Sequence, residues 1–400
     1  MAALTLADAA RPDALTGPSP ASLAWSPDSR WLAYTLAGEL LLAPPDPTPT
    51  PTAVCAGVAE FVWLRTGSLL VLTRDGAVCH CATPSADGTA PEPRPLLTLE
   101  AGASELGVSP DESTLSFIVA GDLWLCRLKA ASDGSLTAAT PRQVTDVGVP
   151  PIASVQLGTY YGVDRGLGRC VWGSAAPAYE WSADGAWICA HYVDRSAVRK
   201  VPFPYYLSEE TSDNWHRRPY PGDDDEIRRL ALIDASGWDG DGLLPMELVE
   251  LSAPGVPAGH GCGFNTFSWR PLGAELLVDV TSDTGQARGL HLLAPAASGS
   301  ESALVWSDFG EDRTYPSVSA GWLQDGSAAW LIIDAEQVHQ LALIDMPTVP
   351  ELLSAESPPP VRMLTVRYIS CQCSARRHKP FRRQRSSSCM SSLTGLFVTG

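Results

Sequence analysis

The sequence lacks long apolar runs, a secretory leader and a compact cysteine framework. No run reaches the ~18–20 apolar residues that a membrane-spanning helix needs. Residues Met1 to Asp8 contain neither a basic segment nor a sustained apolar one, so no secretory signal is predicted. The ten cysteines are scattered, and Cys126 and Cys189 stand in strand-like patterns where a free thiol packs as a small hydrophobic group. We therefore expect a cytoplasmic chain with reduced thiols and no membrane partner.

Basic residues are also scarce. The chain has 28 Lys and Arg against 45 Asp and Glu, for a net charge of −17. Residues 361–400 hold eight of the basic residues and no acidic one, so residues 1–360 carry a net charge of −25. This balance argues against nucleic acid as a partner of the main body. The acidic surface either keeps the chain in solution or attracts cationic ligands such as peptide amino termini.

Spacings typical of metal and nucleophile sites are missing as well. None of the seven histidines has another at i+4, and Cys79-His80-Cys81 is an isolated strand cluster. The pair Cys371-x-Cys373 is too sparse for a metal centre. No Gly-x-Ser-x-Gly nucleophile elbow occurs anywhere. We predict no catalytic residue, no cofactor and no metal in this chain.

One β-hairpin pattern, in contrast, recurs along the chain. Between Tyr179 and Asp194, two aromatic and β-branched segments flank Ser182-Ala183-Asp184-Gly185, whose polar residues and final Gly suit a type I turn. Similar segments begin at Trp25-Ser26-Pro27-Asp28 and Val108-Ser109-Pro110-Asp111. The serines of these copies are therefore predicted to be turn residues rather than nucleophiles.

The hairpins repeat at intervals that indicate a propeller. Their anchor residues lie 38, 45, 73, 88 and 53 residues apart, and they are Trp25, Trp63, Val108, Trp181, Trp269 and Trp322. A period of about 40–50 residues with four short strands is typical of propeller blades. We predict an all-β fold, a β-propeller of seven or eight four-stranded blades or an incomplete ring of that kind. Each anchor Trp is expected to be buried between blades, and the two long gaps to hold outer strands and arms.

Composition divides the chain into three parts. Residues 1–20 are predicted to be a flexible lead-in, residues 21–347 the propeller, and residues 348–400 a Pro-rich and then basic, disordered tail. Two stretches inside the propeller, 158–174 and 199–225, are rich in Gly, Pro and aromatic residues and lack strand alternation. Long loops in compact domains are often functional, so we expect a binding surface there.

The tail changes character after Pro358-Pro359-Pro360. Its segment from Arg376 to Arg385 resembles a nuclear-localisation or nucleic-acid patch, and Ser386-Ser387-Ser388 would suit a basophilic kinase. A disordered extension and translation outside the ancestral frame are the other two interpretations. We expect residues 361–400 to contribute nothing to closure of the propeller.

The middle of the chain resembles the amino-terminal propeller of dipeptidyl peptidase IV-type enzymes, in the prolyl oligopeptidase superfamily. The resemblance covers roughly residues 20–347. It is carried, in the family's order, by 179–198, Val201-Pro202-Phe203-Pro204-Tyr205, 217–223 and 227–234. In that family the propeller has eight blades as a rule and caps a carboxy-terminal α/β-hydrolase domain. The resemblance implies that a Ser, Asp, His triad in that second domain does the chemistry, while the propeller admits and positions peptides.

Two features depart from the family's pattern. Only 56 residues follow Ile344, too few for the αβ alternation of a hydrolase domain. The family's paired glutamates, which hold the substrate's amino terminus, lie shortly before the hairpin, where this chain has Asp164, Arg165 and Arg169. Glu209-Glu210 follows the hairpin and is expected to be a solvated loop pair, so substrate-binding residues stay unassigned.

Two functions remain open at the level of the sequence. One is the substrate-gating portion of a dipeptidyl peptidase IV-like serine peptidase, inactive without its catalytic domain. The other is a stand-alone propeller that acts as a binding or scaffold module without enzymatic activity. The implied partners are a peptide or protein ligand and either the missing hydrolase domain or a partner protein.

Overall fold

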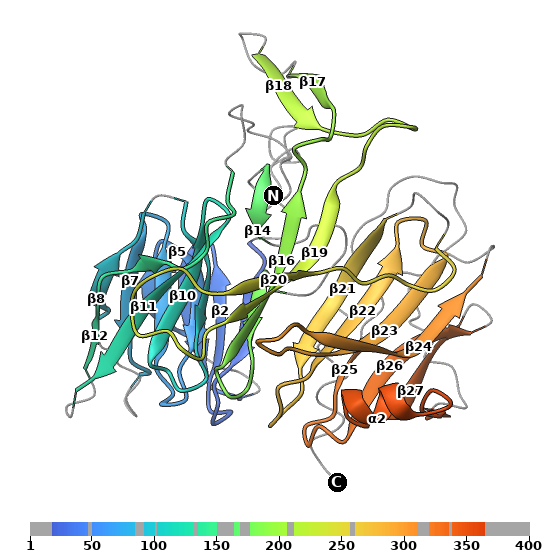
Figure 1. Cartoon of the computed structure of the whole chain (residues 1–400). Coiled ribbons are helices and arrows are strands. Elements are labelled where there is room, and N and C mark those ends of the chain that lie inside the picture. Colours follow the sequence, from blue (N-terminus) through green and yellow to red (C-terminus); the bar gives the residue numbers. More distant parts are fainter. Residues whose placement is uncertain are drawn as a thin grey trace, which may run out of the picture.

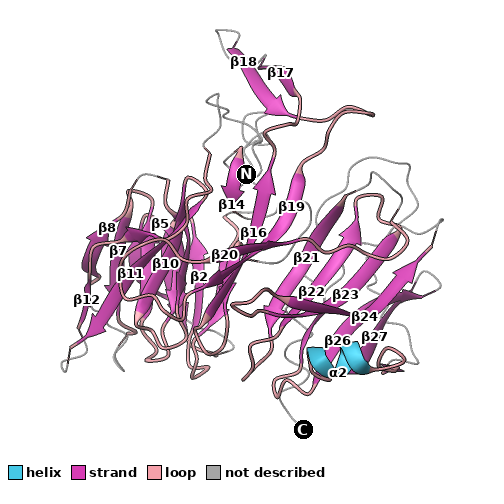
Figure 2. Ribbon diagram, viewed as in Figure 1, coloured by secondary structure: helices cyan, strands magenta, loops and turns pink. Residues whose placement is uncertain are grey.

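The structure, a computed structural model, describes residues 18–46, 50–84, 92–100, 102–131, 135–149, 164–168, 177–205, 212–256, 261–310, 320–335 and 338–364. Within these residues the chain forms six antiparallel sheets of at least four strands each and one separate two-stranded sheet (Figure 1). The six sheets are the blades of a β-propeller, which confirms the predicted fold class. Figure 2 shows that strands dominate and that helix is confined to one short element near the last sheet. No helix in this part of the chain could cross a membrane.

The first three blades follow one another along the chain, each as a meander. The first consists of β1 (Ala21–Trp25), β2 (Leu32–Leu36), β3 (Glu39–Ala43) and β4 (Thr52–Ala56). The second consists of β5 (Val58–Trp63), β6 (Leu69–Thr73), β7 (Ala77–Cys81) and β8 (Arg94–Thr98). The third consists of β9 (Ser104–Val108), β10 (Thr114–Val119), β11 (Asp122–Ala130) and β12 (Leu136–Ala138), with β13 (Arg142–Gln143) also paired to β11.

The fourth blade departs from this regular meander. It consists of β14 (Arg165–Leu167) and β15 (Tyr179–Trp181), which pair with different halves of β16 (Trp187–Asp194), followed by β19 (Ile227–Asp234) and β20 (Met246–Val249). The fifth consists of β21 (Cys262–Trp269), β22 (Leu276–Ser282), β23 (Ala287–Ala294) and β24 (Glu301–Phe309). The sixth consists of β25 (Ala320–Trp322), β26 (Ala328–Ala335), β27 (Val338–Asp345) and β28 (Val361–Met363).

The recurring serines build the hairpin turns, as the sequence predicts. In the fourth blade, Ser182 Oγ donates to Asp184 Oδ1 at 2.6 Å and accepts the backbone N–H of Trp187 at 2.9 Å. Ser26 in the first blade and Ser109 in the third make the same pair of bonds. The last turn residue has a positive φ, 71° at Gly185, a conformation that Gly adopts without steric strain. Each of these hydroxyls is therefore engaged in the hydrogen bonds of its own turn.

Apolar side chains of consecutive blades form the core. Five clusters of buried residues are present, each shared by two neighbouring blades, from the first and second to the fifth and sixth. Because an inner blade is covered on both faces, strand β10 of the third blade is buried at all six positions. Cys126 and Cys189 are fully buried free thiols in these clusters, as expected.

Indole hydrogen bonds link the blades at their first strands. Trp63, Trp269 and Trp322 each donate from Nε1 to a backbone carbonyl of the preceding blade, at 3.2, 3.0 and 2.9 Å. Trp181 donates instead to Ser116 Oγ of the third blade at 2.9 Å. The expectation that every anchor Trp is buried between blades is wrong for Trp25, which is 54% exposed. The reason is that no blade precedes the first one among the described residues.

Residues 348–364 differ from the tail that the composition predicts. Helix α2 (Val349–Ser354) begins after Thr348, and the N–H of Val349 donates to Glu275 of the fifth blade at 2.8 Å. Strand β28 then pairs with β27 as the fourth strand of the sixth blade. A segment of three residues is too short to show strand alternation, so no strand was predicted there. The rest of the predicted tail, and the lead-in as far as residue 17, lie outside the described residues.

Candidate functional site

A β-hairpin arm projects from the fourth blade. It consists of β17 (Lys200–Tyr205) and β18 (Ser212–Arg217), which pair with each other and with no other strand that the structure describes. The arm is inserted between β16 and β19, and Figure 1 shows it standing clear of the blades. Pro202 and Pro204 have no backbone N–H, so two hydrogen-bond donors are missing from β17. A two-stranded hairpin tolerates this loss because both of its strands are edge strands. The arm coincides with the second of the two stretches predicted to form a binding surface.

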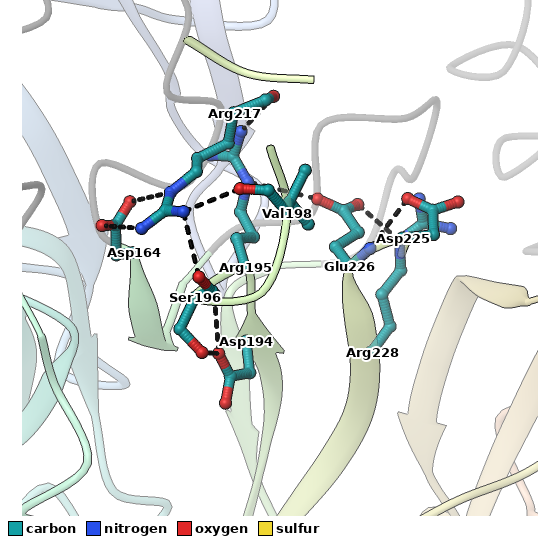
Figure 3. A network of polar contacts seen from close by, with 9 residues as sticks. All are labelled: Asp164, Asp194, Arg195, Ser196, Val198, Arg217, Asp225, Glu226 and Arg228. Atoms are coloured by element: carbon teal, nitrogen blue, oxygen red, sulfur yellow. Dashed lines mark hydrogen bonds and ion pairs between the residues drawn. The ribbon is translucent and has the colours of Figure 1, made fainter. Parts of the chain in front are cut away.

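Arg217 anchors the arm at its base (Figure 3). Its Nη2 donates to Asp164 Oδ2 at 2.8 Å and its Nε to Asp164 Oδ1 at 3.2 Å, so the guanidinium grips both carboxylate oxygens. Its Nη1 donates to the carbonyls of Ser196 at 3.0 Å and Val198 at 2.7 Å. The side chains of Arg217 and Asp164 are only 9% and 5% exposed. A two-pronged, largely buried pair of this kind fixes orientation as well as position.

A second chain of charges continues from the arm to the fifth blade. Arg195 donates to the Arg217 carbonyl at 3.0 Å and pairs with Glu226 at 3.4 Å. Arg228 then pairs with Glu226 at 2.7 Å and with Asp283 at 2.6 Å. Asp283 follows strand β22, so the network spans the arm, the fourth blade and the fifth blade. In these ion pairs the three arginines face the carboxylates of Asp164, Glu226 and Asp283.

The arginines of the network bind carboxylates and backbone carbonyls. Its one hydroxyl among the residues drawn in Figure 3, Ser196 Oγ, donates to Asp194 Oδ1 at 2.6 Å, and the same carboxylate oxygen accepts the backbone N–H of Ser196. Arg195 is 3% exposed, and its Nη1 has no hydrogen-bond partner within the described chain. Across the same residues, no group of three or more His, Cys, Asp or Glu side chains could hold a metal ion.

The structure brings together the two stretches from which a binding surface was expected. Asp164 belongs to the first stretch and Arg217 to the second, and they meet although 53 residues separate them. Arg165 lies beside this site but donates from Nε to the Val147 carbonyl at 3.2 Å. Arg169 and the pair Glu209-Glu210 lie outside the described residues.

No sequence pattern predicted the other four members of the network, which are Arg195, Glu226, Arg228 and Asp283. Arg228 and Asp283 are 55 positions apart, and no spacing rule relates charges at such a separation. The available signal was only the high density of charged residues between 194 and 229.

Two titratable groups, the buried His191 and the half-buried Glu180, lie between the fourth and fifth blades. Burial lowers the pKa of His191 to about 3, and the positive charge of Arg228 adds to this effect. The ring lies 4.8 Å from Phe267 and 6.0 Å from Phe264, centroid to centroid, and its Nε2 has no partner within the described chain. Burial raises the pKa of Glu180 to about 7. His191 belongs to β16 and Glu180 to β15, where Glu180 is paired across the strands with Cys189.

Comparison with known proteins identifies the fold. No protein-family model matches the chain, and no curated protein sequence matches it. Among solved structures, dipeptidyl peptidase 4 of Porphyromonas gingivalis matches with a TM-score of 0.56 at 13% identity, over 81% of this chain. A protein of Bacteroides ovatus described as a dipeptidyl aminopeptidase IV matches with a TM-score of 0.55 at 12% identity, over 86% of this chain.

Both matches cover only 45% of the solved chains, so this chain spans less than half the length of those proteins. The identities are too low to carry more than the architecture. The resemblance that the sequence motifs predict is thus confirmed at the level of the fold: the chain has the fold of one part of dipeptidyl peptidase structures.

Proposed function

We propose that this chain is the propeller portion of a dipeptidyl peptidase IV-like serine peptidase, which admits and positions peptides and has no hydrolytic activity of its own. A cytoplasmic location, a peptide or protein ligand and a separate hydrolase domain or partner protein are parts of this proposal. The observation that carries it is the anchored arm. A propeller of this fold holds a projecting hairpin at a fixed angle through the pair of Arg217 and Asp164.

The physical argument concerns rigidity. A hairpin of two six-residue strands is only marginally stable alone, so it keeps one orientation only if its base is fixed. Five hydrogen bonds from Arg217 and Arg195 provide this fixation, four of them donated by Arg217. A fixed arm on one rim of a propeller is suited to guide an extended peptide. It cannot cleave one, because nucleophilic catalysis needs a Ser activated by a positioned base.

The experiment has two parts. The purified chain is assayed with Xaa-Pro dipeptide amides and with a fluorophosphonate probe for active-site serines, and we expect neither turnover nor labelling. Native extracts are then searched by mass spectrometry for a longer product that contains these blades and a Gly-x-Ser-x-Gly segment. Turnover that a single Ser→Ala change abolishes would refute the proposal. The proposal would also be refuted if cells contained neither a product of greater length nor a catalytic partner.

The second candidate is a stand-alone binding or scaffold module. It is favoured by the absence of any nucleophile elbow from the 400 residues. The search of native extracts, which is the second part of the experiment, distinguishes the two candidates. A chain isolated from cells with a binding partner but without a hydrolase would support the scaffold function.

A further inference from the structure

Three thiols gather between the first and second blades. Cys79 and Cys81 belong to β7 and are buried, and Cys55 belongs to β4 and is half-buried. All three contact the hydrophobic cluster that these two blades share. Among the residues that the structure describes, no other hydrophobic cluster contains three cysteines. The interface between the first two blades is therefore rich in thiols.

Two local features place these thiols at the same interface. Cys79 and Cys81 are two positions apart in β7, and side chains at that spacing point to one face of a strand. On β4, Ala53 and Cys55 pair with adjacent residues of β3, which leaves Val54 as an extra residue. An extra residue of this kind re-aims the side chains around it. Val54 and Cys55 therefore both contact the cluster, although they are neighbours in the chain.

Cys55 and Cys81 share a hydrogen bond across the interface. Burial raises the pKa of both thiols, and the hydrogen bond adds to the rise at Cys81 but opposes it at Cys55. The S–H of Cys81 therefore donates to the sulfur of Cys55. Cys79 is less suited to pair with Cys81, because two residues of one extended strand have parallel side chains and Cα atoms about 6.7 Å apart, which is at the limit for a disulfide.

We propose that Cys55 and Cys81 form a reversible disulfide when the chain reacts with a peroxide, and that this bond links the first blade covalently to the second. The half-buried Cys55 is the thiol that the oxidant reaches, and the buried Cys81 is the thiol that resolves the oxidised form. In a reducing compartment such disulfides are transient and report the redox state. The proposal is independent of the peptidase assignment, because it depends only on the contact between two blades.

The oxidation balances with hydrogen peroxide as the oxidant. The thiolate of Cys55 attacks one peroxide oxygen, the O–O bond breaks, and a sulfenic acid and a hydroxide ion form. The sulfur of Cys81 then attacks the sulfur of Cys55, so the S–O bond breaks and the S–S bond forms. The two sulfurs give two electrons to the peroxide, and the two thiol protons end in two molecules of water. Because burial raises the pKa of Cys55, the reaction should be faster at pH 8.5 than at pH 7.

The test is mass spectrometry of the full chain before and after treatment with hydrogen peroxide at pH 8.5, followed by blocking of free thiols with N-ethylmaleimide. Trypsin places Cys55 and Cys81 on separate peptides, because Arg65 and Arg74 lie between them. We expect the digest without reductant to contain these two peptides joined, and dithiothreitol to release them. The bond closes a loop from position 55 to position 81, so the Tm of the oxidised chain should be several degrees above that of the reduced chain.

Single variants assign the bond to its two sulfurs. Cys55→Ala and Cys81→Ala should each abolish the joined peptides and the rise in Tm, whereas Cys79→Ala should keep both. The matched control is Cys262→Ala, which removes the other half-buried thiol of the described chain, between the fourth and fifth blades, and should leave the bond intact. Melting curves of the reduced proteins confirm that each variant folds.

Two results would overturn the proposal. One is a native chain whose two peptides stay separate after the treatment, whether Cys55 is then unreacted or oxidised to a sulfinic acid. The other is a bond from Cys55 that persists in Cys81→Ala, which would assign the pairing to a different thiol.

Discussion

Arg288 and Asp279 form an ion pair in which both side chains are 0% exposed. The guanidinium donates to the two carboxylate oxygens at 2.8 and 2.7 Å. It also donates to the carbonyl of Ile332 at 2.7 Å and so connects the fifth blade with the sixth. Burial raises the pKa of Asp279, and the charge and hydrogen bonds of Arg288 oppose that shift.

Removal of one partner of this pair should be strongly destabilising. Arg288→Met leaves a buried carboxylate without its counter-charge, and we expect it to lower the free energy of unfolding by roughly 3–5 kcal/mol. The double variant Arg288→Met, Asp279→Leu should recover most of that loss because no buried charge remains. Urea denaturation of the three proteins provides the measurement. A double variant no more stable than Arg288→Met would contradict this account.

The anchor tryptophans should differ in their contribution to stability. Trp181 packs against the cluster between the third and fourth blades and donates to Ser116, so Trp181→Ala should cost about 3–5 kcal/mol. Trp25→Ala, measured at a concentration at which the chain is monomeric, should cost less than about 1 kcal/mol because the side chain is 54% exposed. Equal losses in chemical denaturation would show that Trp25 is covered in the folded monomer.

Loss of Arg217 should release the arm without unfolding the blades. Arg217→Ala leaves Asp164, which is 5% exposed, without its ion-pair partner. A loss of about 3 kcal/mol in local stability corresponds to roughly 100-fold faster amide exchange in β17 and β18. Strands β10 and β22 should exchange at the native rate. Arg218→Ala, at the exposed neighbouring position, is the matched control. Unchanged exchange in the arm would mean that other contacts hold it.

Acidification should destabilise the fold through His191. Its pKa is about 3 in the folded chain and 6.5 as the ordinary value, so between these pH values only the unfolded chain binds the proton. The stability that the neutral ring contributes is present above pH 6.5 and is lost as the pH falls toward 3. His191→Leu removes this dependence, and its stability relative to the native chain should rise by about 2 kcal/mol from pH 7.5 to pH 5. Parallel unfolding free energies at the two pH values would contradict the assignment.

Two truncations should separate the end of the sixth blade from the rest of the predicted tail. Deletion of residues 361–400 removes β28, and with it Val361 from the cluster between the last two blades, so the Tm should fall by several degrees. Deletion of residues 365–400 keeps β28 and should leave the Tm within about 2 °C. Equal melting temperatures for the two truncations would show that β28 adds nothing to the sixth blade.

The sequence by itself determined the blades. Ser182, Asp184 and Gly185 specify a turn through bonds among residues at most five positions apart, and the flanking apolar residues specify two paired strands. Such signals are local, so repetition of the pattern at Trp25, Trp181 and Trp322 was enough to predict an all-β propeller. The position of the arm was also predictable, because its prolines and lack of alternation excluded a place within a blade.

Only the tertiary structure decided how these parts meet. Whether Trp25 is covered depends on the presence of a blade before it, which its own hairpin does not encode. Asp164 and Arg217 pair across 53 residues, and their charges alone do not distinguish a buried anchor from a solvated surface. Strand β28 forms because it pairs with the free edge of β27. Its three residues are too few to carry a strand pattern of their own. Backbone turns follow from near neighbours, whereas burial and long-range pairing follow from where the folded chain places its surfaces.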